Sequence, residues 1–328
     1  MIRAGLLVLV LALGARAEMV RDSASQALLD KAGALYEKSD WKASAELYRL
    51  AARKGIDPAV SWFNYGNALA QMRKTGEAAA AWMRALEWAP RFKRARQNLA
   101  ILAEENRNWG EAAKHWRILW DVDSSDVAPA NRLGEISLQS GATGDAAEWF
   151  ARGRNVDSTS AAAHLGLARA RLTAGDTTLA LEALDRYAPQ AASDTTGRLV
   201  LSLGGLYEAC QAWRRAERAY QDVLLVAPKS VQTWLRLARL SQLRKRDAEA
   251  VIVLRQALEN VPGSPLLWKA LGQAGARAGN ARDAVQGYGK ALELGDKSAK
   301  VGLRSLSGWL KARGETSLST SVDSLLLR

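Results

Sequence analysis

The chain contains few of the residues on which disulfide scaffolds, metal centres and thiol enzymes depend. Its 328 residues include one cysteine, two histidines, three phenylalanines and seven prolines. A single cysteine excludes a disulfide framework, so we expect a fold held by packing alone, with Cys210 as a buried thiol. A metal site or a catalytic triad needs several convergent ligands or bases. We therefore interpret His115 and His164 as ordinary helix residues and expect no metal and no cofactor.

Long apolar runs are also scarce, and the one that stands out lies at the N-terminus. Arg3 precedes an uninterrupted apolar stretch over residues 4–14, and Ala15-Arg16-Ala17 follows as a small-x-small cleavage site. This pattern predicts a signal peptide over residues 1–17 with cleavage after Ala17, and hence export, most simply to a bacterial periplasm. The run is too short to span a bilayer, which takes about 20 residues, although an uncleaved anchor stays open as the alternative.

Acidic residues are outnumbered, and the formal charge is +12. Removing Arg3 and Arg16 with the signal lowers that charge by two, to +10, so the mature chain stays basic. A basic chain favours acidic partners or anionic surfaces, although a solvated, slightly basic surface explains the charge equally well. An exported protein rarely meets nucleic acid, so we expect none as partner, and membrane contact only indirectly.

Set against these scarcities is a pattern that repeats along most of the chain. Counted from residue 59, Trp62, Tyr65 and Gly66 stand at positions 4, 7 and 8, and Ala78 and Trp82 at positions 20 and 24. Similar residues return about every 34 positions, with a two-residue slip before one unit. The repeat units start near residues 25, 59, 93, 127, 161, 197, 231 and 265.

These units resemble the tetratricopeptide repeat (TPR) superfamily, whose pattern of Trp, Leu, Gly and Tyr followed by Ala, aromatic and Pro they match. The resemblance implies an all-α fold, a right-handed superhelical solenoid of about eight helix-turn-helix repeats over residues 18–298. Residues 299–328 are expected to form a degenerate, capping helix pair. The last three leucines, Leu325 to Leu327, either complete that cap or form an exposed end.

The small residues of the repeat predict close contacts between helices. A side chain larger than glycine at Gly66 would hold the two helices of its unit apart, Ala78 faces the same contact, and Trp62 and Trp82 fill the space between the helices. We also place all seven prolines at unit junctions, because proline destabilises a helix interior by about 3 kcal/mol. The equivalents of Gly66 are all small: Ala32, Ala100, Gly134, Ala168, Gly204, Ala238 and Gly272.

Two stretches are similar to ligand loops, but the repeat explains both. The glycines of GQAGARAGN (272–280) occupy repeat positions, and no strand precedes them as a phosphate loop requires. DVDSSD (121–126) lacks the glycine and the final glutamate of a calcium loop, so we expect a solvated turn followed by a helix cap. No constellation of nucleophile, base or ligands remains, and the sequence predicts a protein that is not an enzyme.

In TPR proteins the ligand usually lies along the inner groove, and one known use is a clamp for a peptide's terminal carboxylate. By that resemblance, Asn67, Asn98 and Arg132 stand at three of the five clamp places, whereas Phe63 and Ala128 replace the lysines. Amide and guanidinium groups suit a carboxylate or an extended peptide backbone. An exposed polar helix face is the simpler alternative. The predicted binding residues of this first cluster are Asn64, Asn67, Arg94, Asn98 and Arg132.

A second cluster of groove positions is basic and would suit an acidic segment, or is only a basic face. Its members are Arg236, Arg239, Lys269 and Gln273, extended by Lys300 and Arg304.

Two segments of the first repeats narrow the expectation further. LYEKSDWKASAELYRLA and WFNYGNALAQ…RALEWAPRFKRARQNL resemble the TPR components of Bat aerotolerance operons, which act with other envelope proteins. The sequence therefore favours a non-enzymatic scaffold or adaptor that binds a protein or peptide in the cell envelope. A binder of an anionic envelope polymer, glycan or lipid through the basic surface is the alternative, and salt-sensitive affinity would distinguish it.

Overall fold

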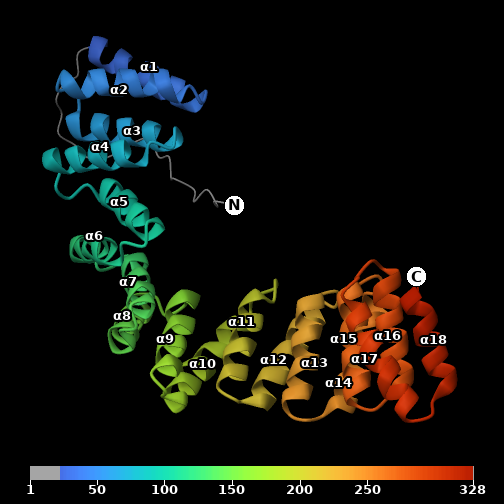
Figure 1. The fold of residues 1–328 in the computed structure, drawn as a ribbon. Helices are drawn as coiled ribbons and strands as arrows, with labels where there is room; N and C mark the ends of the chain where they lie inside the picture. The colour runs from blue at the N-terminus through green and yellow to red at the C-terminus, as the bar shows by residue number, and fades with distance from the viewer. Residues whose placement is uncertain (1–22, 328) are drawn as a thin grey trace. The chain divides into compact units, whose positions relative to one another are not determined.

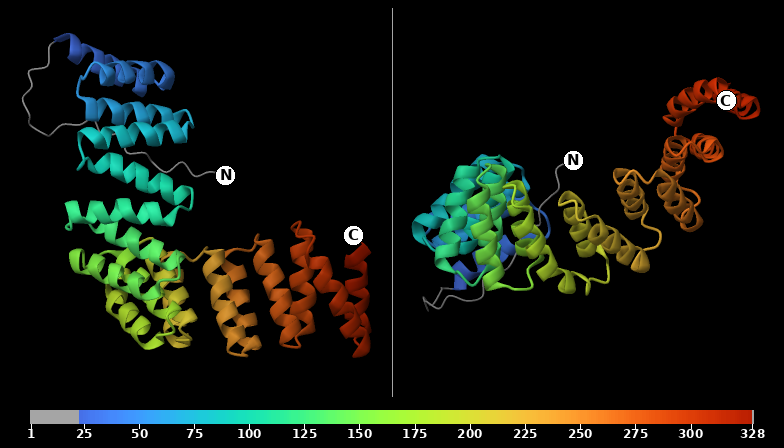
Figure 2. Two further views of the ribbon diagram at one scale, coloured as in Figure 1. Left: turned by 60° about the vertical axis from the view of Figure 1, so that its left-hand side comes forward. Right: turned by 90° about the horizontal axis from the view of Figure 1, so that it is seen from below.

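The computed structural model describes residues 23–327, in which all regular secondary structure is helical. The expected signal peptide, residues 1–17, lies outside the described residues. The chain divides into two compact units, which meet in sequence between Ser160 and Ala161. Each unit is a stack of antiparallel helix pairs, as Figures 1 and 2 show. The all-α repeat fold predicted from the sequence is confirmed.

The first unit contains four helix pairs, and each helix packs against the one that follows it in the chain. Its helices are α1 (Ser23–Glu37), α2 (Trp41–Arg53), α3 (Pro58–Gln71), α4 (Thr75–Trp88), α5 (Lys93–Glu105), α6 (Trp109–Val122), α7 (Val127–Gln139) and α8 (Thr143–Val156).

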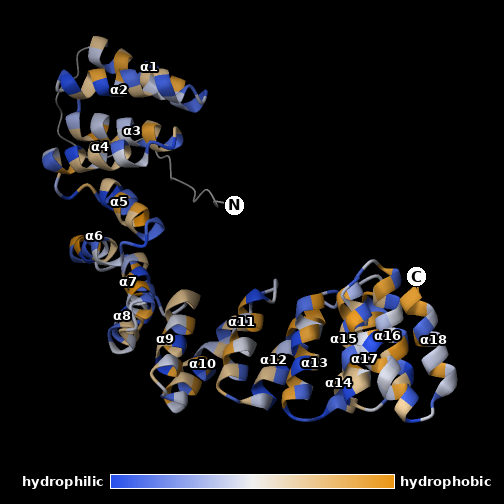
Figure 3. Cartoon of the chain, viewed as in Figure 1, coloured by the Kyte–Doolittle hydropathy of each residue, from blue (hydrophilic) through white to orange (hydrophobic). Residues whose placement is uncertain are grey.

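The second unit contains four further pairs and a terminal pair. Its helices are α9 (Ala161–Thr173), α10 (Thr177–Ala191), α11 (Arg198–Ala209), α12 (Trp213–Val226), α13 (Val231–Leu243), α14 (Asp247–Asn260), α15 (Pro265–Arg277), α16 (Ala281–Glu293), α17 (Ala299–Ala312) and α18 (Thr316–Leu327). Apolar and polar residues alternate along these helices, so each helix turns an apolar side toward its neighbours (Figure 3).

Within a pair, a ring from the second helix lies on a small residue of the first. A Cβ atom added to Gly66 would lie 2.6 Å from Cδ1 of Trp82, and one added to Gly134 would lie 2.8 Å from the Phe150 ring. Real Cβ atoms essentially never approach so closely. The contact predicted for Gly66 is therefore confirmed, because no side chain fits between its helix and the ring.

The residue at position 20 of each repeat lies on the second helix and packs against the first helix at the same contact. Ala78 on α4 is 0% exposed, and so are the residues at this position in the other repeats. A methyl group fills the gap between the helices of a pair in most repeats, and the hydroxyl of Ser44 fits there because it donates to the carbonyl of Ala32 at 2.9 Å. The equivalents of Ala78 are Ser44, Ala112, Ala146, Ala180, Ala216, Ala250 and Ala284.

The turn inside each repeat reverses the chain through one left-handed residue. In the α3–α4 turn, Arg73 has a φ of 61°, and the backbone N–H of Lys74 donates to the carbonyl of Leu69 at 3.0 Å. This arrangement satisfies carbonyls that the end of α3 leaves unpaired. Glycine takes the left-handed place in three repeats and other residues take it in five: Gly141, Gly175 and Gly279, then Ser39, Arg73, Arg107, Gln211 and Lys245.

All seven prolines were expected at the junctions between repeats, and for one of them this expectation is wrong. Pro58 and Pro265 each open a helix, but Pro189 lies inside α10, two residues before its last residue, Ala191. A proline there removes only one hydrogen bond of the final turn, which explains why the helix tolerates it. The two-residue slip is taken up by the longer loop that follows, where Gly197 has a φ of 69°.

The turn at residues 121–126 behaves as predicted. Asp123 accepts hydrogen bonds from the backbone N–H and hydroxyl of Ser125, and Asp126 caps α7 by accepting from the N–H of Ala128. Lys93 contacts Asp123 at 2.6 Å. The hydrogen bonds from Lys93 and Ser125 lower the pKa of Asp123 to about 2.

The terminal pair α17–α18 continues the stack on α16. The buried Ser307 hydroxyl donates to Asp323 at 2.7 Å, which joins the two helices, and Lys311 contacts the other oxygen of that carboxylate. Of the terminal leucines, Leu325 and Leu326 pack against the core of this pair, whereas Leu327 is 90% exposed. The leucines thus complete the cap except for the last one.

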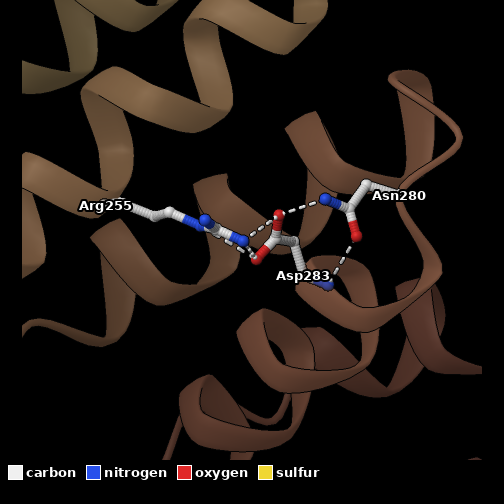
Figure 4. Close-up of polar contacts among 3 residues, drawn as sticks. All are labelled: Arg255, Asn280 and Asp283. Carbon is white, nitrogen blue, oxygen red and sulfur yellow. Dashed lines mark hydrogen bonds and ion pairs between the residues drawn. The ribbon is translucent and has the colours of Figure 1, made fainter.

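A polar contact links the pairs of repeats seven and eight (Figure 4). Asp283 at the start of α16 is 1% exposed, and its carboxylate accepts three hydrogen bonds from the guanidinium of Arg255 on α14, at 2.7–3.1 Å. Asn280 donates to the same carboxylate from the preceding turn. A buried charge is thereby paired and hydrogen-bonded. No helix in the described part of the chain has the length and apolar composition needed to cross a membrane.

Candidate functional site

In the first predicted cluster, Asn67 is hydrogen-bonded to the buried Trp82 and to Asn98. Asn67 was expected on the open groove, but it is only 4% exposed. Its Oδ1 accepts hydrogen bonds from Trp82 Nε1 and from Asn98 Nδ2, both at 3.0 Å. A buried indole N–H needs an acceptor, and Asn67 is the residue that provides it. Asn67 therefore joins α3, α4 and α5, and its carbonyl oxygen is already used by these two donors.

The remaining members of this cluster are more accessible. Asn64 on α3 and Arg94 on α5 are half-buried, and Arg132 on α7 is exposed. Arg132 lies 3.4 Å from Oε2 of Glu104 on α5, whose other oxygen accepts a 2.6 Å hydrogen bond from Trp116. The positive charge of Arg132 thus faces an acidic neighbour, which weakens its suitability as a carboxylate clamp.

A similar arrangement occurs in the second unit, where Glu208 and Tyr220 stand at the repeat positions of Glu104 and Trp116, and Arg236 stands at that of Arg132. Glu208 on α11 accepts a 2.8 Å hydrogen bond from the Tyr220 hydroxyl, and Arg239 lies 3.9 Å from its other oxygen. Arg236 also hydrogen-bonds the Tyr220 side chain. Burial and the bond to Glu208 raise the pKa of Tyr220 to about 12. Arg236 and Arg239 therefore belong to a network that holds consecutive repeats together.

The other two predicted residues, Lys269 and Gln273, line a pocket of about 520 Å³ between α15 and α17. This volume is in the usual range of ligand pockets, about 300–1,000 Å³. The walls combine apolar groups with a few polar ones, as ligand pockets generally do. The remaining lining residues are Ala276, Tyr288, Ser298, Val301, Gly302, Ser305, Leu306 and Trp309.

A glycine packs tightly on the Tyr288 ring beside this pocket, and Tyr288 itself is buried, with 8% of its surface exposed. A Cβ atom added to Gly302 would lie 2.4 Å from the ring of Tyr288, so a side chain there cannot coexist with the ring in its present place. Burial raises the pKa of the Tyr288 phenol, and the charge of Arg277 opposes this shift. Trp309 adds a second ring, on which the guanidinium of Arg313 stacks at 4.6 Å from the centroid.

The polar side chains of the pocket differ in whether they already form hydrogen bonds or ion pairs within the protein. Lys269 Nζ lies 2.9 Å from Asp296 and 3.0 Å from the Ser298 hydroxyl, so its charge is compensated. Hydrogen bonds from Ser298 and Lys269 lower the pKa of Asp296. Gln273 on α15 is exposed and makes no hydrogen bond to any other described residue. Its amide is free to donate and to accept.

Sequence reasoning found Lys269 and Gln273 but missed the aromatic pocket beside them. The frame of the repeats shifts by one residue in α17, which places Gly302 against the ring of Tyr288. A step of 34 residues from residue 265 would start the next repeat at residue 299. Leu303 and Leu306 occupy the buried positions 4 and 7 only when the repeat starts at residue 300, so the sequence itself indicates the shift.

The residues with reactive side chains lie elsewhere. Cys210 is buried, as predicted, and burial raises the pKa of its thiol. His164 is buried and stacks on Tyr187 at 4.8 Å between ring centroids. His115 lies 3.5 Å from Glu111, and burial lowers the pKa of its imidazole. Within residues 23–327, no group of three His, Cys, Asp or Glu side chains gathers as a metal site would require.

Comparison with known proteins agrees with this architecture. Two segments match the family described as tetratricopeptide repeat: residues 97–158 in the first unit and residues 234–274 in the second. The C-terminal part of a TPR repeat-containing protein from Cytophaga hutchinsonii superposes with a TM-score of 0.58 at 18% identity, over 74% of this chain and 99% of that one. A tetratricopeptide repeat protein from Parabacteroides merdae gives a TM-score of 0.47 at 17% identity, over 86% and 98%.

Among curated proteins, the peroxisomal targeting signal receptor of Saccharomyces cerevisiae is 30% identical over 101 residues. The match spans 31% of this chain and 16% of that receptor, so it concerns only a few repeats. Family matches in both units, the repeated Gly–ring contacts and the likeness of fold lead to one conclusion. The chain belongs to the tetratricopeptide repeat superfamily.

Proposed function

We propose that the protein is a non-enzymatic scaffold of the cell envelope that binds a protein or peptide on its first-helix face. We use this name, within each unit separately, for the surface that its odd-numbered helices (α1 to α7, or α9 to α17) present at repeat positions 2, 5, 6, 9, 12 and 13. Tetratricopeptide repeats serve in general as protein-interaction scaffolds. The observation that carries the proposal is the pocket between α15 and α17, where Gln273 offers an unused amide beside apolar walls.

Three further points support the proposal. Among the described residues no group of three His, Cys, Asp or Glu side chains gathers as a metal site, and the carboxylates of Glu104 and Glu208 are already engaged by an aromatic residue and an arginine each. The relative from Saccharomyces cerevisiae is, by its name, a receptor for a targeting signal. The envelope location follows from the signal peptide predicted over residues 1–17.

A capture experiment tests this proposal. Mature protein, starting at Glu18, is used as bait in an envelope fraction of the native organism. Beside it run a first-helix variant, Arg132→Glu with Arg239→Glu, and a second-helix variant of equal charge, Arg218→Glu with Arg282→Glu. Circular dichroism and thermal melting of the first-helix variant must match those of the wild type, because Arg132 and Arg239 lie near Glu104 and Glu208 of the preceding repeats. All four arginines are exposed. We expect a discrete protein that the wild type and the second-helix variant retain and the first-helix variant loses, at low and moderate salt alike.

Two results would contradict the scaffold. Capture of anionic polymer alone, erased by moderate salt, would instead favour a basic-surface binder. Equal loss of the protein partner with both charge variants would show that net charge, and not the first-helix face, determines binding.

A further inference from the structure

We infer that the pocket between α15 and α17 receives a large apolar side chain, best an aromatic one, from an extended acidic segment of a partner protein. The inference rests on the proposed function, since it names the ligand chemistry of one part of the first-helix face. The pocket, the charges beside it and the unused amide of Gln273 each constrain the occupant.

The walls of the pocket select the side chain. Trp309 on α17 is half-buried, Val301 on the same helix is 66% exposed although it is apolar, and the edge of the mostly buried Tyr288 ring completes the lining. An aromatic ring placed among these groups would bury the remaining apolar surface of Val301 and Trp309 and contact the Trp309 ring. A pocket of about 520 Å³ admits a large side chain together with part of the chain that carries it.

The charges next to the pocket select the flanking residues. The helix α17 carries Lys300, Arg304 and Lys311 and no acidic residue. Lys311 pairs with Asp323, but Lys300 and Arg304 form no ion pair within the described residues. Arg304 lies three residues after Val301 and next to Ser305, so it borders the wall that lines the pocket. Two uncompensated cations there favour carboxylates on either side of the inserted side chain.

The polar groups inside the pocket favour a peptide over a free small molecule. Gln273 offers both a donor and an acceptor, which matches the alternating N–H and C=O groups of an extended backbone. Lys269 already pairs with Asp296, so no uncompensated positive charge inside the pocket would favour an anionic ligand group there. The acidic groups therefore belong at the rim, beside Arg304, and the apolar group belongs inside.

A direct binding measurement tests this inference. The probe is a short fluorescent synthetic peptide with a central tryptophan flanked by aspartates, and its affinity for the full mature protein is followed by anisotropy. We expect the same peptide with alanine in place of tryptophan to bind about tenfold more weakly or worse, because the burial of a large apolar side chain is lost. Replacing the aspartates by asparagines should also weaken binding and reduce its dependence on salt.

A matched pair of serines tests the location. Ser305 and Ser321 are both exposed on helices, and each hydroxyl donates to the carbonyl four residues earlier, but only Ser305 lines the pocket. We expect Ser305→Phe to lower the affinity for the tryptophan peptide at least tenfold and Ser321→Phe to leave it unchanged. Ala276→Phe, on the opposite wall, should act like Ser305→Phe, and circular dichroism confirms that each variant is folded.

The charge is tested in the same assay by Arg304→Glu, with Arg282→Glu as the control of equal charge. Arg304→Glu should abolish the preference for aspartates over asparagines, whereas Arg282→Glu should keep it. The inference is overturned when the tryptophan and alanine peptides bind alike, or when binding ignores both Ser305→Phe and Ala276→Phe. A protein partner captured on the first-helix face but indifferent to these two variants would overturn this inference and leave the proposed function standing.

Discussion

The contact between Gly66 and Trp82 gives the most quantitative prediction about how the repeats are held together. The Trp82 ring is 3% exposed and is fixed by its hydrogen bond to Asn67, so it has little room to move away. A methyl group at residue 66 would lie 2.6 Å from two atoms of the ring and 3.1 Å from the carbonyl oxygen of Ala78. Either the ring or the whole helix α4 must shift.

The size of the effect follows from two opposing terms. Overpacking a core contact costs about 1–3 kcal/mol, whereas replacing a helical glycine by alanine alone gains about 0.5–1 kcal/mol. The difference of the two terms is about 0–2.5 kcal/mol, and because the clash with Trp82 is severe we expect Gly66→Ala to lower the free energy of unfolding by an amount in the upper half of that range. Gly66→Leu places several more atoms in the same contact, and its effect should reach or exceed the upper end of the overpacking range.

Urea denaturation followed by tryptophan fluorescence measures the effect. The matched control is Gly76→Ala, because Gly76 lies on α4 itself and a Cβ atom there meets nothing within 4 Å. The control should be as stable as the wild type or slightly more stable. An unchanged denaturation midpoint for Gly66→Leu would refute the packing account of this contact.

Two further predictions concern ionic contacts. Arg255→Ala should destabilise the second unit by about 1–3 kcal/mol, since it removes a charged hydrogen-bond partner of the buried Asp283, whereas Arg282→Ala at an exposed site should change the denaturation midpoint little. Lys93→Met should move the pKa of Asp123 upward from about 2, as followed by NMR titration of the carboxyl carbon. Because a depressed folded-state pKa stabilises above the unfolded value, the contribution of this pair is present above about pH 4 and is lost as pH falls toward 2. No change in that titration would show that Lys93 does not act on Asp123.

The repeat fold was predictable because its determinants are local and recur. Gly66, Ala78 and Trp82 recur as types at fixed positions, and the contact among them depends only on the two helices of one pair. Small and aromatic residues at regular intervals are therefore enough to predict the fold, even where the residue at one position differs between repeats.

The predicted binding site was less reliable, because burial depends on which partner each polar residue finds. Asn67 occupies a groove position, yet the indole N–H of Trp82 requires an acceptor and draws Asn67 into the interior. Arg132 and Arg239 are exposed as expected, but Glu104 and Glu208 stand beside them. The repeat pattern does not predict these two glutamates beside the arginines, because it describes how helices pack and not which polar residues of neighbouring repeats pair.

The pocket was not predictable from the repeat frame. It depends on the one-residue shift in α17, on Gly302 standing against the Tyr288 ring, and on the small residues Ala276 and Ser305 at the rim. A frame continued without a shift from α15 would have placed other side chains there. Pro189 is a similar case, because its tolerance depends on where α10 ends.

Site-specific photo-crosslinking in living cells tests the central claim, that a protein partner lies on the first-helix face, most directly. A photoreactive amino acid replaces Gln273 on α15 in one strain and Gln286 on α16 in another, both exposed glutamines. We predict that the residue at 273 forms a crosslink to a discrete protein on irradiation and that the residue at 286 does not. Crosslinking at 286 alone, or no crosslinked protein at 273, would contradict the account.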